Sequence, residues 1–179
     1  MLSSELAIYR VPDKENSEVQ LLNVLSLIGE RLNRANILWA VGGSVLLNQY
    51  GLEDKPGDID ILVDVLDIDR ADEILTAIGQ KKQGRVSELY ATKHFYQYEM
   101  NGVDVDVMAG FATHHSQGVF EYVFDGESVT EIKNINWVDI PFCSLEDWYV
   151  IYQLIPGRQA KVAKIKEYLL AKGLSHPNL

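Results

Sequence analysis

The sequence predicts a single domain of the α/β or α+β class, with a mixed β-sheet flanked by helices. The chain has 179 residues, which suits one domain. Its composition, 47% hydrophobic and 23% charged residues, is that of an ordinary soluble globular protein. Helical and strand-like hydrophobic patterns both occur along it. Within residues 1–179 we expect an α/β core at about 18–142 and C-terminal helices at about 144–173.

The first half of the chain predicts helices that alternate with short strands. Apolar residues spaced three or four apart indicate a helix over 17–34, and the apolar run 37–41 is too short for anything but a buried strand. Gly42-Gly43-Ser44 then begins a second helix. This second helix is expected over 45–50, and it is followed by a loop over 51–57, a strand over 58–63 and a helix over 66–78.

The second half predicts antiparallel strands followed by two helices. Asn101-Gly102 separates the strand-like runs 94–100 and 103–111, which is typical of a tight hairpin. Short strands are expected near 129–133 and 136–140. Ser144, with Asp147 three residues later, predicts a capped helix that ends near Ile155. After Pro156-Gly157, the chain predicts a last amphipathic helix with one apolar stripe.

Composition excludes several classes of protein. The net charge of −10 argues against a general affinity for nucleic acid. The single cysteine, Cys143, excludes an internal disulfide and a cysteine-cluster metal site. No apolar run approaches the roughly 18 residues that span a bilayer, and the first residues lack the pattern of a secretory signal. We therefore expect a cytoplasmic protein that does not enter a membrane.

The charges are unevenly distributed along the chain. Residues 53–73 carry nine acidic side chains and two basic ones, whereas residues 158–172 carry five basic side chains and one acidic one. In one domain, these two segments could together hold a metal ion and a phosphorylated ligand. The alternative is two solvated faces of opposite sign.

Two pairs of aspartates suggest a metal site. Asp58 and Asp60 lie two residues apart on a predicted strand, so both carboxylates point to the same face. Such close like charges favour a divalent cation between them, and all-oxygen ligands suit Mg²⁺. Asp104 and Asp106 repeat the spacing on another strand, and a third carboxylate would allow two metal ions. A lone Asp-x-Asp is common at strand ends, so the prediction depends on both pairs.

These residues resemble the nucleotidyltransferase superfamily of DNA polymerase beta type. The resemblance rests on Val-Gly-Gly-Ser-Val-Leu-Leu at 41–47, Asp-Ile-Asp-Ile-Leu-Val at 58–63 and Val-Asp-Val-Met at 105–108. The chain is most similar to the small bacterial members grouped with lincosamide and aminoglycoside nucleotidyltransferases and abortive-infection toxins. The resemblance covers about 37–111 well and continues more weakly to Arg158. It implies a nucleotidyltransferase-like fold with a helical C-terminal segment.

The resemblance also implies an activity and a set of site residues. The activity is transfer of a nucleoside monophosphate from a Mg²⁺-bound nucleoside triphosphate to an acceptor hydroxyl, with release of pyrophosphate. By position, Asp58, Asp60 and Asp106 would be catalytic and would ligate two Mg²⁺ ions, with Asp104 as the alternate third carboxylate. The residues that would bind the triphosphate are Gly42, Gly43, Ser44, Arg158 and Lys161. The acceptor, which could be a small molecule, a tRNA end or a protein side chain, is left open.

A second hypothesis is a module that keeps this fold but acts through a protein partner, as in a toxin–antitoxin pair or a sensor. It would explain why the loop Glu53–Gly57 lacks the Arg and Thr that relatives often carry before the first aspartate. The three strand aspartates favour the enzyme, because a non-catalytic relative has no need of them. A homo-oligomer is left open under both hypotheses.

Overall fold

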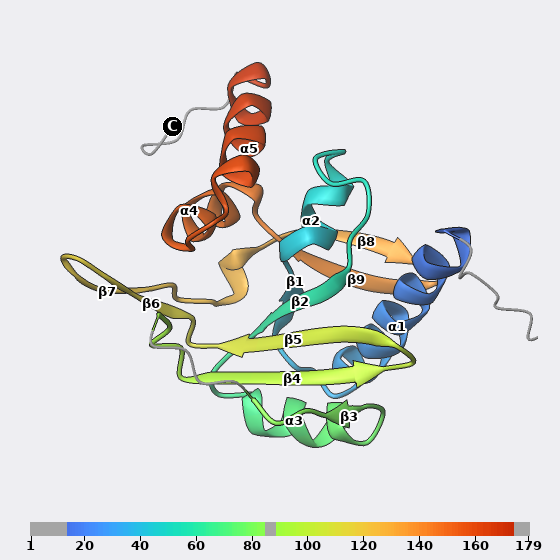
Figure 1. The fold of residues 1–179 in the computed structure, drawn as a ribbon. Coiled ribbons are helices and arrows are strands. Elements are labelled where there is room, and N and C mark those ends of the chain that lie inside the picture. The colour runs from blue at the N-terminus through green and yellow to red at the C-terminus, as the bar shows by residue number, and fades with distance from the viewer. Residues whose placement is uncertain (1–13, 85–88, 174–179) are drawn as a thin grey trace, which may run out of the picture.

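The computed structural model describes residues 14–84 and 89–173, and it confirms the predicted class: a mixed seven-stranded sheet flanked by helices (Figure 1). The helices are α1 (Lys14–Arg34), α2 (Gly43–Gln49), α3 (Ile68–Thr76), α4 (Leu145–Leu154) and α5 (Gln159–Ala171), with a 3-10 turn at Gly126–Ser128. The strands of the main sheet are β1 (Trp39–Val41), β2 (Asp58–Val63), β3 (Gln80–Lys81), β4 (His94–Met100), β5 (Val103–Ala109), β8 (Val129–Ile135) and β9 (Val138–Cys143).

The order of the strands in the sheet places β2 at its centre. The order is β3-β4-β5-β2-β1-β9-β8. β2 pairs antiparallel with β1 and parallel with β5, so that Asp58 lies beside Asp104 and Asp60 lies beside Asp106. The parallel pairing therefore brings together two Asp-x-Asp segments that are far apart in the sequence.

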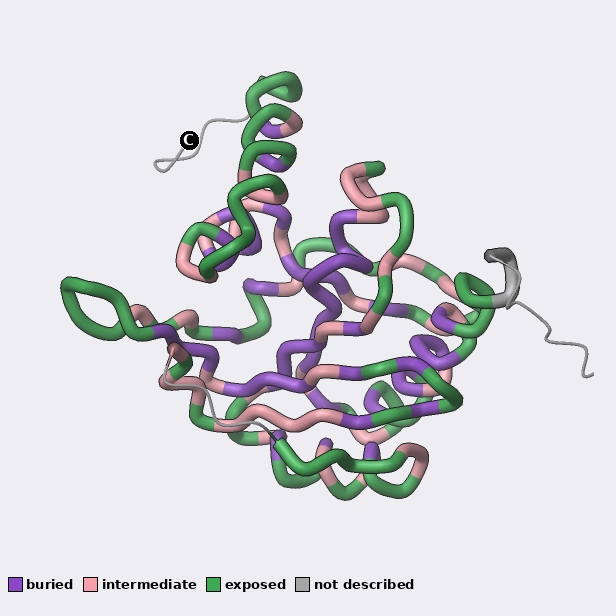
Figure 2. Tube along the Cα trace, viewed as in Figure 1, coloured by how far each residue is buried: buried purple, intermediate pink, exposed green. Residues whose placement is uncertain are grey.

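Helices cover both faces of the sheet. The predicted apolar face of α1 is buried, and Leu25, Ile28 and Leu32 are fully enclosed against the sheet. Figure 1 shows α4 and α5 on the opposite side of β4 and β5 from α3. In Figure 2 the buried residues gather in the central strands, whereas α5 is exposed along most of its surface and buries only Ile165 and Leu169. None of the described helices has the length and apolar character needed to cross a bilayer.

Two hairpins of the structure differ from the predictions. The strand expected over 103–111 ends at Ala109, because Gly110 adopts a positive φ of 61° and turns the chain. A two-stranded hairpin, β6 (Ala112–His115) with β7 (Gly118–Glu121), follows it. The strands expected near 129–133 and 136–140 are longer, since their turn lies at Asn136 and Trp137, both with positive φ. Asn-Trp is not a recognised two-residue hairpin signal.

Candidate active site

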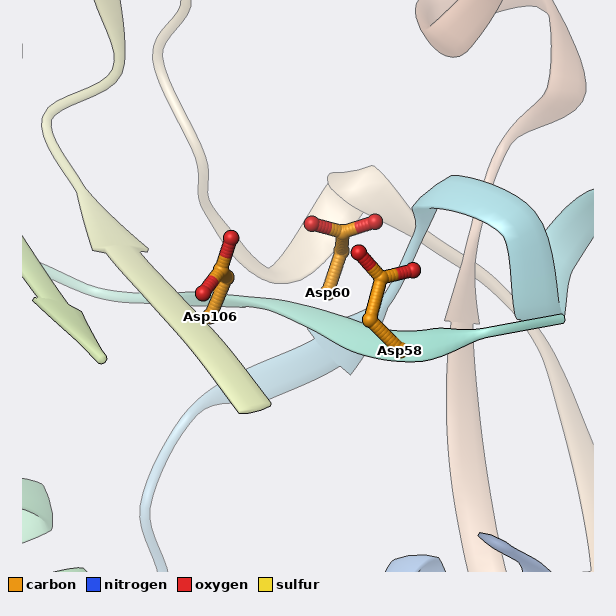
Figure 3. Close-up of side chains that lie close together, drawn as sticks. All are labelled: Asp58, Asp60 and Asp106. Atoms are coloured by element: carbon orange, nitrogen blue, oxygen red, sulfur yellow. The ribbon is translucent and has the colours of Figure 1, made fainter. Parts of the chain in front are cut away.

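Three carboxylates from the two central parallel strands lie together on one face of the sheet. Asp58 and Asp60 come from β2, and Asp106 comes from β5 (Figure 3). One carboxylate oxygen from each lies within 4.8 Å of those of the other two, and all three residues are half-buried. The described residues thus include a compact set of oxygen donors, as a divalent cation requires.

The turn that begins α2 touches the middle carboxylate. The Gly42 N–H donates to the Asp60 carbonyl oxygen over 2.9 Å. Gly43 has a φ of +58°, and a Cβ at this position would lie 1.8 Å from Asp60 Oδ2. The glycine therefore serves two purposes: it allows the left-handed backbone of the turn, and it leaves room for the Asp60 carboxylate.

Side chains hold the two outer carboxylates by hydrogen bonds. Ser44 Oγ donates to Asp58 Oδ1 over 3.1 Å, and Gln97 Nε2 donates to Asp106 Oδ1 over 3.0 Å. Gln97 was not among the predicted site residues. A signal was available, because counting outward from the Asn101-Gly102 turn places Gln97 opposite Asp106 on β4.

Burial and mutual repulsion disfavour ionisation of the cluster. The pKa of Asp60 is raised to about 7, first by burial and then by the charges of Asp58 and Asp106, against the opposing effects of Lys161 and Arg158. The pKa of Asp106 is also raised, chiefly by burial. A concentration of negative charge that nearby cations do not balance is what a bound divalent cation would relieve. The carboxylate-only donor set suits Mg²⁺, so the residues fit the metal that the resemblance implies.

The structure places Asp104 outside the cluster. Its side chain is 61% exposed and forms an ion pair of 2.5 Å with Lys82, which follows β3. Asp104 and Asp106 point to the same face of β5, as their spacing predicts, but Asp104 is two residues nearer the hairpin turn. Of the two candidates for the third carboxylate, Asp106 is the one that the fold brings to Asp58 and Asp60.

A cavity of about 580 Å³ lies over the carboxylates. Arg158 and Lys161, from the start of α5, line it together with the three aspartates, and Lys161 also pairs with Glu53 over 3.8 Å. Much of the remaining lining is aromatic or apolar, namely Tyr90, Phe95, Met108, Phe111, Trp148, Ile151, Tyr152 and Ile155. Gly42, Gly43 and Ser44, which were predicted to bind the triphosphate, are buried and are not among the residues that line the cavity.

The raised pKa of Asp60 predicts that the stability of the protein depends on pH. The pKa of Asp60 is about 7 in the folded protein against an ordinary value of 3.8. Between these values the folded state binds more protons than the unfolded state, so the free energy of unfolding falls as the pH rises from about 4 to 7. Asp60→Asn removes the contribution of Asp60 to this pH dependence. In the presence of EDTA we therefore expect the variant to gain stability relative to the unaltered protein as the pH rises.

Urea unfolding with EDTA at about pH 5 and about pH 8 measures this difference. Added Mg²⁺ at the higher pH should stabilise the unaltered protein and leave the variant little changed, because only the former keeps the full ligand set. Parallel pH profiles for the two proteins would contradict the assignment of the raised pKa to Asp60.

Solved structures of nucleotidyltransferases share this fold. The Thermotoga maritima protein TM1012, assigned as a nucleotidyltransferase, is 25% identical over 86% of this chain and 94% of its own, with a TM-score of 0.66. The aminoglycoside-resistance factor ANT(2'')-Ia, in complex with adenylyl-2''-tobramycin, is 13% identical over 86% of this chain and 90% of its own, with a TM-score of 0.58. The lincosamide adenylyltransferase LnuA, bound to lincomycin, is 15% identical over 84% of this chain and 97% of its own, with a TM-score of 0.53.

These likenesses confirm the predicted resemblance to nucleotidyltransferases and the fold that it implies. No protein-family model matches the chain, and no curated protein does either.

Proposed function

We propose that this protein is a Mg²⁺-dependent nucleotidyltransferase that moves a nucleoside monophosphate from a nucleoside triphosphate to an acceptor hydroxyl. The observation that carries the proposal is the convergence of Asp58, Asp60 and Asp106 beneath a cavity whose lining also includes two cationic side chains. The shared fold with adenylyltransferases supports it.

The residues divide the chemistry between the sheet and the C-terminal helices. Asp58 and Asp60 would hold Mg²⁺, which supplies charge neutralisation on the triphosphate and orients its α-phosphate. Arg158 and Lys161 would bind the triphosphate oxygens from the other side of the cavity. Gly43 and Ser44 would act by fixing the positions of Asp60 and Asp58, since Gly43 packs against the Asp60 carboxylate and Ser44 Oγ donates to Asp58.

Asp106 would act on the acceptor. The acceptor oxygen forms a bond to the α-phosphorus, the bond between that phosphorus and the bridging oxygen breaks, and pyrophosphate leaves. The hydroxyl proton passes to the Asp106 carboxylate, whose Oδ1 is held by Gln97. Positioning and charge neutralisation account for the rate, with no covalent intermediate on the protein.

The acceptor that this cavity suits best is a small molecule with a hydroxyl group. Its volume of about 580 Å³ lies within the usual range for small-molecule sites. The residues beside Asp106, among them Phe95, Met108 and Phe111, are uncharged and would contact an apolar part of the acceptor. Two proteins of similar fold hold small molecules: ANT(2'')-Ia is in complex with adenylyl-2''-tobramycin, and LnuA is bound to lincomycin.

Titration calorimetry with each nucleoside triphosphate, with Mg²⁺ and with EDTA, tests the proposal. We expect saturable binding that needs Mg²⁺ and that disappears in Asp58→Ala/Asp60→Ala, because the variant lacks both carboxylates that would hold Mg²⁺. Thermal unfolding of the variant controls for its fold. Absence of binding by the unaltered protein would contradict the proposal.

One observation favours the alternative, a module that acts through a protein partner. Glu53, from the loop that departs from the family pattern, pairs with Lys161 and would compete with a triphosphate for that cation. Glu53→Gln distinguishes the two hypotheses. If the protein is an enzyme, the variant should bind nucleoside triphosphate more tightly; if it acts only through a protein partner, the variant should still bind no nucleotide.

A further inference from the structure

The two edges of the main sheet differ in how well they are protected. At one edge, β3 has only two residues, Gln80 and Lys81, and so offers little backbone for pairing. At the other edge, β8 has seven residues and, among the described strands, pairs only with β9. A long strand with one unpaired side is the kind of edge to which another chain adds.

The backbone groups of β8 that are free for such pairing can be identified from its register. Ile135 and Val138 flank a two-residue turn and therefore form a hydrogen-bonded pair. Because hydrogen-bonded pairs alternate along an antiparallel ladder, Ile132 and Asn134 direct their N–H and C=O groups away from β9. The irregularity in the ladder, between Val129 and Glu131, lies at the start of the strand.

Exposed apolar side chains accompany this edge. Ile132, in the middle of β8, is 64% exposed. Trp137, in the turn at the end of β8, is 96% exposed and holds a φ of +68°, which is unusual for a bulky side chain. An aromatic side chain that is almost wholly in solvent, on a strained backbone, at the end of an open edge marks this as an interaction surface.

The charges on β8 select a second copy of the same strand as the partner. Two identical strands that pair about a two-fold axis must place one residue opposite itself. With Glu131 or Lys133 at the axis, like charges would face each other, which destabilises a strand pair. With Ile132 at the axis, Glu131 of each copy lies opposite Lys133 of the other. The N–H and C=O groups of the two Ile132 residues, which point away from β9, can then form hydrogen bonds with each other.

We propose that two copies of this protein associate through β8, paired antiparallel about Ile132. The two seven-stranded sheets then form one continuous sheet. Trp137 of each copy lies beside the start of the other copy's β8 and loses much of its exposure. The proposal is independent of the proposed function, because β8 and β9 supply none of the residues that line the cavity.

Sedimentation equilibrium of the full chain at physiological salt tests the association. We expect a concentration-dependent dimer. Lys133→Glu and Glu131→Lys each place like charges across the axis and should weaken the dimer by about tenfold or more. The double variant Glu131→Lys/Lys133→Glu restores opposite charges and should dimerise as the unaltered protein does.

Two controls make the test specific. Lys166→Glu, on the exposed side of α5, makes the same change of charge away from β8 and should leave the dimer intact. Since Lys133 also lies over the rings of Tyr50 and Phe142, Glu131→Lys covers the case in which Lys133→Glu fails to fold.

Tryptophan fluorescence offers a second readout of the dimer. Trp39 and Trp148 are buried, so acrylamide quenching reports chiefly on Trp137 and should fall as the dimer forms. A protein that stays monomeric at every concentration, or a dimer that both charge reversals leave unchanged, would overturn the proposal.

Discussion

Asp60→Asn is expected to lower nucleotidyl transfer by at least about a thousandfold while the protein remains folded. Asp60 occupies the middle of the carboxylate cluster and faces Asp58, Asp106 and the cations of α5. Asparagine has nearly the same shape, so packing around the turn at Gly43 is retained. What is lost is one negative charge and one oxygen ligand, and both would be needed to hold Mg²⁺ against the triphosphate.

The assay is Mg²⁺-dependent release of pyrophosphate from a nucleoside triphosphate, with water or an identified acceptor receiving the nucleotidyl group. Asp104→Asn is the matched control. It makes the same chemical change on the neighbouring strand, at a carboxylate that is exposed, paired with Lys82 and outside the cluster. We expect the control to keep most of the activity. Equal losses in the two variants would show that general charge, rather than the cluster, accounts for the effect.

Gly43→Ala is expected to reduce activity by about a hundredfold or more, with a modest loss of stability. An added Cβ would lie 1.8 Å from Asp60 Oδ2 and 2.6 Å from its Cγ, so the carboxylate must move. The backbone cost adds to this, because alanine in the left-handed region is less stable than glycine by about 1 kcal/mol. The side chain that moves is the central ligand of the proposed site, so activity should suffer more than stability.

Gly51→Ala separates the backbone effect from the displacement of Asp60. Gly51 also has a positive φ, +70°, but a Cβ there would meet nothing within 4 Å. Urea unfolding should show comparable backbone costs for the two variants, while pyrophosphate release should fall only in Gly43→Ala. Full activity in Gly43→Ala would mean that the position of Asp60 does not matter to the reaction.

Local signals in the sequence predicted the elements that carry the site. Asn101-Gly102 predicted the β4–β5 hairpin, and alternation predicted that Asp58 and Asp60 share a face. Ser144 caps α4 by accepting from the Asp147 N–H, as its spacing indicates. These features depend on residues close in the chain, and so a single sequence contains them.

The periodicity of a single strand does not choose between Asp104 and Asp106, and the preference for Asp106 came from the family resemblance. Both residues point to the same face of β5, so periodicity treats them alike. Two non-local facts decide which of them joins the cluster: the parallel register of β5 against β2, and the approach of Lys82 to Asp104. Lys82 follows β3, a strand of two residues with no hydrophobic pattern of its own.

The aromatic residues that line the cavity could not be predicted from the sequence either. Tyr90 and Phe111 reach it from the chain on either side of the β4–β5 hairpin, close to the unpredicted β6–β7 hairpin. Tyr96 and Tyr98 of β4 do not line the cavity: the Tyr98 hydroxyl donates to Asp72, and Lys81 lies over the Tyr96 ring. Trp148 and Tyr152 of α4 are buried in the core and also line the cavity.

The packing of Trp148 against Gly42 has a consequence for the order in which the proposed site is completed during synthesis. A Cβ on Gly42 would lie 2.0 Å from the Trp148 ring, so α4 docks directly on the turn whose backbone N–H binds Asp60. A nascent chain that has emerged from the ribosome as far as Cys143 already contains all three carboxylates, but neither Arg158 nor Lys161. The cavity would therefore gain its two cationic side chains only when the last helices dock, after the carboxylates have already come together.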